Sequence, residues 1–250
     1  MQFADRKEFL QLVGADCCAV FVVIHVLDED QTDRNIGRAI AGGAHGVFLI
    51  NHDFGVEPFL PIIQAARRKY PDVFIGINFL GVTGKYAFPK LAHLQSAGCR
   101  IDAYWADDAR IDESRSAADQ PEADEILRIK IECGWRGLYF GGTAFKKQRE
   151  VAPEDYRTSA EIAREWMDVV TTSGVATGCE PGTDKINTFR SGVGMRPLAL
   201  ASGVTPDNVR LYCDRLDAIL VATGINVDND FYNVETSKLR ELLRAAGNND

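Results

Sequence analysis

The chain has 250 residues, with 28 Lys and Arg against 36 Asp and Glu, which gives a formal net charge of −8. This acidic balance excludes the broad basic surface of a nucleic-acid-binding protein, and no apolar run approaches the roughly 18 residues that a membrane span requires. The N-terminal segment is charged and lacks a signal-peptide core, so we expect a cytoplasmic protein. None of the six cysteines forms a C-x-x-C pair, so no zinc framework is expected.

Short apolar runs alternate with helical patterns along the whole chain. The expected strands are residues 18–26, 46–51, 74–80, 101–106, 137–142, 168–172, 197–201 and 217–223. Between them lie helical segments at 33–43, around Phe59 to Ala66, up to Gly98, around 126–133, at 153–168, at 184–191 and from Thr205, with a last helix facing inward through Leu239 to Ala246. Such alternation indicates an α/β fold with a parallel sheet.

Eight strand-helix units in about 250 residues favour a (β/α)8 TIM barrel. We predict one domain over 1–250, in which residues 1–14 form a helix that caps the N-terminal mouth and 247–250 are a flexible tail. A doubly wound sheet is the alternative, but no expected strand is followed by the G-x-G-x-x-G pattern of such folds.

The stretch from Pro197 to Gly224 has the pattern of a phosphate site. A strand ends at Ser202-Gly203, a helix is expected to start at the N-cap Thr205, and a second strand ends at Thr223-Gly224. In TIM barrels the last two turns and a short helix point backbone N–H groups at an anion. The alternative is an ordinary αβ unit that needs glycine for its turns.

The other polar candidates follow the remaining strands, where the chemistry of a barrel takes place. We predict catalytic roles for His25, Asp53, Asp102 and Lys146, with proton transfer by one of the first three. Lys146 could form a Schiff base, or it could orient the substrate together with Asn51 and Asn78. The loop after the sixth strand adds Ser173, Gly174, Thr177 and Gly178 as ligand-binding candidates. For Asp102 an ion pair with an arginine is an equally good explanation.

A divalent cation is left open, since His25, Asp53, Asp102 and Asp107 offer mixed nitrogen and oxygen ligands. No spacing enforces such a site, so no metal ligand is assigned and no cofactor is evident. The expected partner is a small phosphorylated ligand, without nucleic acid, and a homo-oligomer remains open.

Four segments together resemble the BtpA family of TIM-barrel proteins, in order and spacing over roughly residues 18–245. They are Asn35 to Phe59, Asp168 to Gly178, Leu200 to Val209, and Phe231 to Val234. The resemblance implies that His25, Asn51, Asp53 and Lys146 match family positions. One branch of that family is associated with photosystem I biogenesis, and others look like enzymes of sugar or nucleoside metabolism.

The chain departs from the family pattern in three places. Leu27 to Asp30 replaces a Pro-Leu-Pro-Gly-Ser-Pro loop, Ile50 replaces a glutamate, and Gly141 or Gly142 replaces an acidic residue. We therefore carry three hypotheses: an enzyme of sugar phosphates or ribose phosphates that works by acid–base chemistry (a lyase, an isomerase or a glycosyl transferase), a non-catalytic BtpA-like binding or assembly protein, and a metal-dependent hydrolase or lyase.

Overall fold

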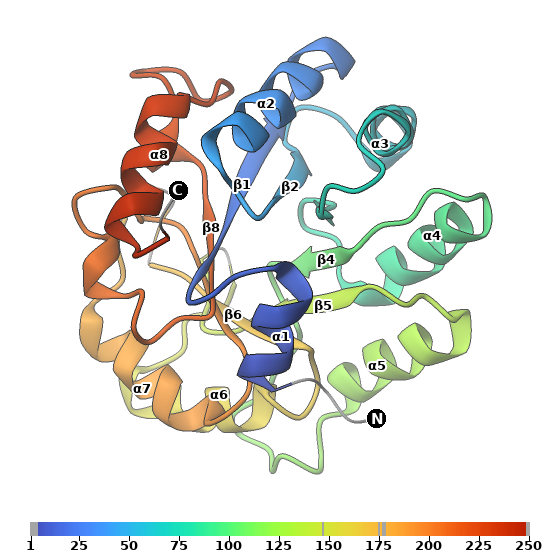
Figure 1. Ribbon diagram of the computed structural model, residues 1–250. Helices are drawn as coiled ribbons and strands as arrows, with labels where there is room; N and C mark the ends of the chain where they lie inside the picture. Colours follow the sequence, from blue (N-terminus) through green and yellow to red (C-terminus); the bar gives the residue numbers. More distant parts are fainter. Residues whose placement is uncertain (1–4, 147, 175, 177–178, 249–250) are drawn as a thin grey trace.

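Eight parallel strands form a closed barrel in sequence order in the computed structural model, which describes residues 5–146, 148–174, 176 and 179–248 (Figure 1). The strands are β1 (Ala19–Val26), β2 (Gly46–Asn51), β3 (Ile75–Asn78), β4 (Ala103–Ala106), β5 (Leu138–Gly142), β6 (Val169–Thr172), β7 (Leu198–Ala201) and β8 (Ala218–Val221). The barrel closes where β1 pairs with β8, in the register Ala19 to Ala218. The predicted TIM barrel is confirmed.

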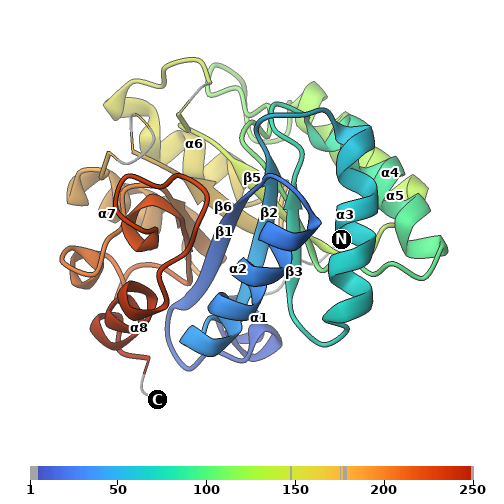
Figure 2. The same ribbon diagram turned by 90° about the horizontal axis from the view of Figure 1, so that it is seen from above.

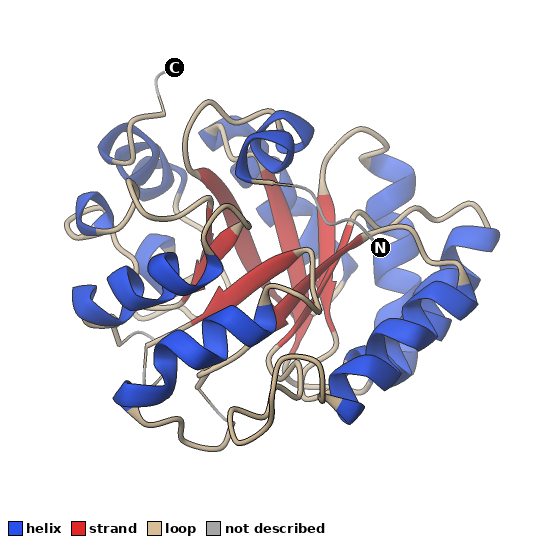
Figure 3. Cartoon of the chain, turned by 90° about the horizontal axis from the view of Figure 1, so that it is seen from below, coloured by secondary structure: helices blue, strands red, loops and turns tan. Residues whose placement is uncertain are grey.

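Helices surround the barrel on all sides (Figures 2 and 3). They are α1 (Arg6–Val13), α2 (Glu29–Gly42), α3 (Val56–Lys69), α4 (Gly84–Ser96), α5 (Pro121–Cys133), α6 (Tyr156–Ala163), α7 (Thr183–Val193) and α8 (Thr236–Ala245). Short 3-10 turns are η1 (Pro153–Asp155), η2 (Val209–Leu211) and η3 (Thr223–Ile225). In the part of the chain that the structure describes, no helix is long and apolar enough to cross a membrane.

The helix expected to start at Thr205 is absent, which corrects the sequence prediction. The backbone N–H of Thr205 donates to Asn208 Oδ1 at 2.8 Å, and Asn208 Nδ2 donates to the carbonyl of Gly203 at 2.8 Å. The carbonyl of Thr205 accepts from the N–H of Val209 at 3.1 Å, so a single helical turn forms there, and the chain goes on in turns and η2 instead of an α-helix.

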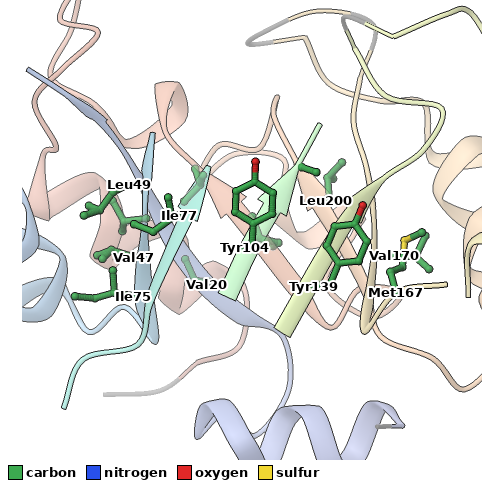
Figure 4. Packing of buried hydrophobic residues seen from close by; sticks show 14 of the residues in the cluster. Val20, Val47, Leu49, Ile75, Ile77, Tyr104, Tyr139, Met167, Val170 and Leu200 are labelled. Carbon is green, nitrogen blue, oxygen red and sulfur yellow. The ribbon is translucent and has the colours of Figure 1, made fainter. Parts of the chain in front are cut away.

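The barrel strands separate two apolar layers. Outward-facing residues such as Val47, Leu49 and Ile77 pack against the helices (Figure 4). Inside the barrel the rings of Phe21, Phe48 and Phe140 contact one another, with centroids 5.1–6.2 Å apart. Phe9 of α1 reaches this inner layer, 6.1 Å from Phe140, so α1 covers the end at which the strands begin.

Four residues at that same end form what we call the basal ring: His45, Asp102, Asp168 and Asp217. Each precedes an even-numbered strand and bridges to one residue of the strand before it, in the pairs His45–Val20, Asp102–Ile75, Asp168–Tyr139 and Asp217–Leu198. In every pair the ring residue donates its backbone N–H to the carbonyl of the strand residue, and its side chain accepts the N–H of that same residue.

Each of the three acidic residues of the basal ring forms an ion pair with a cation from a surrounding helix. Arg67 from α3 lies 2.5 Å from Asp102, Lys130 from α5 lies 3.0 Å from Asp168, and Arg190 from α7 lies 2.7 Å from Asp217. In each case the cation comes from the helix numbered one below the strand: α3 for the residue before β4, α5 for the residue before β6, and α7 for the residue before β8. The ring therefore ties successive strand–helix units together at the basal end.

His45 gives the basal ring a pH dependence. Burial lowers the pKa of its imidazole below the usual 6.5, which keeps the Nδ1 acceptor for Val20 neutral. At a pH between the lowered pKa and 6.5, the unfolded chain binds more protons than the folded chain. The stabilisation is therefore complete above pH 6.5 and is lost as the pH falls through this window. We expect His45→Gln, which retains an acceptor but does not titrate, to lose less stability than the parent chain as the pH falls through this window.

Urea unfolding at pH 7.5 and pH 5 measures the effect, with His93→Gln on α4 as the matched control. The control is expected to show the pH dependence of the parent chain. Identical pH dependence in His45→Gln and the parent would rule out the neutral acceptor at His45.

Candidate functional site

A pocket opens at the end of the barrel at which the strands finish. Seven of the eight strands, or the loops that follow them, contribute to its walls, and its lining is Val23, His25, Ile50, His52, Leu80, Trp105, Asp107, Lys146, Ser202–Val204 and Leu220–Gly224. The enclosed space is about 50 Å³, which holds only a few water molecules. A larger ligand therefore requires side chains of the rim to move outward.

The turns that follow β7 and β8 lie side by side in this pocket. A Cβ atom on Gly224 would collide with the carbonyl oxygen of Val204, and one on Gly203 would collide with that of Cys179. Gly203 also has φ +74°, which favours glycine. Among the described residues, the structure shows no acceptor for the backbone N–H groups of Gly203, Thr223 or Gly224.

The glycines thus have two roles that the sequence could not separate. They allow close approach of neighbouring loops, as the alternative interpretation holds, and they lie in one pocket with His25, as the phosphate hypothesis requires. Backbone N–H groups exposed to a pocket are suitable donors to an anion.

His25 forms an aromatic group at the rim. Its side chain is 6 % exposed, and its ring stacks on Phe231 with centroids 3.9 Å apart and planes at 26°. His52 lies 4.7 Å from His25, and Phe231 meets His52 edge-on at 5.4 Å. Phe231 comes from the segment between η3 and α8, which is tied to α2 because Gln31 and Asn35 donate to the carbonyl of Tyr232.

The carboxylate in the pocket is Asp107, directly after β4. Asn78 Nδ2 donates to Asp107 Oδ1 at 3.1 Å, and Gln148 Nε2 donates to the Asp107 carbonyl. A Cβ atom on Gly142 would collide with that carbonyl, so the backbone of Asp107 occupies the space next to β5. The chain therefore presents an acid from β4 where the family resemblance led us to expect one from β5.

Lys146 lines the pocket from the loop after β5. Its backbone N–H donates to Ser173 Oγ at 2.8 Å, which joins this loop to the end of β6. Below it, Lys185 of α7 donates through Nζ to the carbonyls of Ala144 at 2.6 Å and Ser173 at 2.7 Å. Burial lowers the pKa of Lys185 from 10.5 to about 8.

Several predicted residues support the pocket from outside its lining. Asn51 links two loops, because its Nδ2 donates to Phe54 and its Oδ1 accepts from Leu80. Asp53 is exposed and accepts a hydrogen bond from Tyr232 at 3.0 Å. Gly174, like Gly203, packs closely on the carbonyl of Cys179. Thr177, Gly178 and the last two residues of the predicted tail lie outside the described residues.

The expectation that Asp102 lies among these groups is wrong. It precedes β4 instead of ending it, belongs to the basal ring at the opposite end of the barrel, and pairs with Arg67 and Arg100. The arginine ion pair named as its alternative explanation is the correct one. His25, Asp53, Asp102 and Asp107 consequently do not share one site, and no group of three or more metal-ligating side chains occurs within the described ranges.

Sequence reasoning missed Trp105 as a pocket residue and treated Asp107 only as a metal ligand. The signal was the alternation of β4, in which Ala103 and Trp105 face the barrel interior while Tyr104 and Ala106 belong to the outer layer. Asp107 continues the inward series by two residues. The alternation gave no signal for Phe231, which the sequence singled out only through the family resemblance of the segment Phe231 to Val234.

No family model matches the chain, and no curated protein matches it either. Many solved structures do. A tryptophan synthase α subunit from Legionella pneumophila superposes with TM-score 0.64 at 12% identity, covering 98% of this chain and 100% of that one. (S)-3-O-geranylgeranylglyceryl phosphate synthase from Thermoplasma acidophilum, solved with sn-glycerol-1-phosphate, gives 0.64 at 12% identity, covering 98% and 99%. A KDPGal structure gives 0.61 at 13% identity, covering 90% and 93%. At these identities the similarity shows the TIM-barrel fold alone.

Lys185 provides a test of the scaffold beneath Lys146. Because its pKa is about 8 in the folded chain, the unfolded chain binds more protons between pH 8 and 10.5, and stability rises with pH through that window. We expect the stability of the parent chain relative to Lys185→Met to increase by up to about 3 kcal/mol from pH 7.5 to pH 10, because a tenfold change in proton affinity corresponds to about 1.4 kcal/mol.

Denaturant unfolding at the two pH values measures this difference, and Lys69→Met at an exposed lysine is the control. The control difference is expected to stay nearly constant with pH. A constant difference for Lys185→Met as well would contradict the desolvated environment of Lys185.

Proposed function

We propose that the protein is an enzyme that binds a small phosphorylated ligand in this pocket and acts on it by acid–base chemistry. The observation that carries the proposal is the meeting of two glycine turns, after β7 and β8, with a histidine, a carboxylate and a lysine in one pocket. The pocket therefore places groups that can bind an anion next to groups that can donate and accept a proton.

The phosphate would lie against the turns at Gly203 and Gly224, with Lys146 supplying the compensating charge. Preorganised N–H donors and an ammonium group favour a multiply charged oxyanion. His25 and Asp107 would transfer protons, so Asp107 takes the part that the sequence assigned to Asp53 or Asp102. Such a pair of groups can promote the proton transfers of isomerisation, lyase and glycosyl-transfer steps.

The sequence resemblance supports the further proposal that this chain is a divergent member of the BtpA family. The segments that carry it include the ends of β2, β6 and β7 and the Phe231 segment, all of which border the pocket or its supporting loops. The missing acid at β5 is compatible with catalysis because Asp107 reaches the pocket from the adjacent strand.

Isothermal titration of the full chain with inorganic phosphate and glycerol phosphate tests the proposal. We expect Lys146→Met to weaken both affinities at least tenfold, about 1.4 kcal/mol, because it removes a charge from the anion site. Lys69→Met, which removes the same charge outside the pocket, should bind as the parent does. Failure of the parent to bind any phosphate compound, or equal affinities for parent and Lys146→Met, would refute the assignment.

A further inference from the structure

The floor of the pocket is the inner layer of the barrel. Val23, Ile50, Trp105 and Leu220 line the pocket and belong at the same time to the apolar cluster inside the strands. Leu80, Val204 and Val221 add further apolar lining. Below the polar rim, the described residues offer few partners for hydroxyl groups, and an unpaired hydroxyl buried there would be costly.

One side of the rim carries flat rings: His25 and His52 line the pocket, and Phe231 stacks on His25. His25, His52 and Phe231 stand together with centroid distances of 3.9–5.4 Å. Their planes differ, so they form one stacked and one edge-on contact, the two arrangements that aromatic rings prefer. His52 is half-buried and Phe231 is 36 % exposed, and admission of a ring to the small space would require these two side chains to turn outward.

Trp105 adds a polar requirement to the apolar floor. Its side chain is 4 % exposed, and its Nε1 is buried without a hydrogen-bond partner among the described residues. A buried donor that lacks an acceptor is costly, and a ligand atom that accepts from it recovers that free energy. Since Trp105 lines the pocket, the acceptor can come from a bound molecule.

We propose that the organic part of the phosphorylated ligand is a planar, unsaturated ring that carries a hydrogen-bond acceptor, instead of a polyhydroxylated sugar. The ring packs on the floor under His25, the acceptor receives the Trp105 N–H, and the phosphate lies at the Gly203 and Gly224 turns. The inference rests on the proposed function, because it presumes that the anion site is real.

A ligand series measured by isothermal titration on the full chain tests the ring. The series is inorganic phosphate, glycerol phosphate, cyclohexyl phosphate, phenyl phosphate and 4-acetylphenyl phosphate, which carries a carbonyl acceptor. We expect phenyl phosphate to bind at least tenfold more tightly than glycerol phosphate and at least threefold more tightly than its saturated counterpart. The 4-acetyl compound should bind more tightly still.

Two variants test the acceptor. Trp105→Phe keeps a ring but removes the N–H, so it should abolish the preference for 4-acetylphenyl over phenyl phosphate. Trp135→Phe is the matched control: its Nε1 is also buried without a partner among the described residues, but its ring stacks on Phe88 outside the pocket. The control should keep the preference of the parent. Because the ligand series is measured on the parent chain, it stands even if Trp105→Phe fails to fold.

The outcomes separate the two proposals. Glycerol phosphate binding as tightly as phenyl phosphate, or a 4-acetyl preference that survives in Trp105→Phe, would overturn the ring and its acceptor while leaving the anion site intact. Absence of binding by every phosphate compound, inorganic phosphate included, would overturn the proposed function itself.

Discussion

The barrel depends on the two-point bridges of the basal ring. In each bridge, one residue before an even-numbered strand both donates to and accepts from the backbone of the strand before it. Asp217 is fully buried, and it is held by Arg6 of α1 and Arg190 of α7 at 2.6 and 2.7 Å. A buried carboxylate is tolerated only when charges and hydrogen bonds surround it, so these contacts require α1, α7 and the strands to assemble together.

The basal ring divides the molecule into two ends with different tasks. At the basal end the carboxylates are committed to backbone N–H groups and to cations from the helices, and α1 covers the mouth. At the other end polar side chains gather around an opening, and the loops that carry them are held by one another. Asn78 holds Asp107, Ser173 holds the backbone of Lys146, and glycines let the loops approach closely. Rigid support at one end and loop-borne chemistry at the other is the general arrangement of TIM barrels.

The apolar pattern was sufficient to predict the strands, and β2 has the bounds that were expected. The sequence predictions were wrong at two polar segments, one at Asp102 and one at Thr205. Asp102 was expected inside a strand that runs from Ile101 to Ala106, yet the strand starts at Ala103 and Asp102 pairs with Arg67. Thr205-Pro206-Asp207 has the composition of a helix start, and the carbonyl of Thr205 does accept from the N–H of Val209, but the chain continues in turns and η2 instead of an α-helix. The position of Asp102 depends on Arg67, a partner 35 residues away that the local sequence does not contain.

The sequence by itself determined the class of fold, because alternating buried strands and amphipathic helices have few other ways to bury their apolar faces. It also determined that polar residues follow the strands, and hence that a site would form at one end. Only the tertiary structure decided which residues meet there. Barrel closure brings β8 beside β1, so Gly224 and His25 share a pocket, and the Phe231 segment folds back onto His25. Those contacts join residues about 200 positions apart, and they depend on strand register and loop packing, which local sequence patterns do not encode.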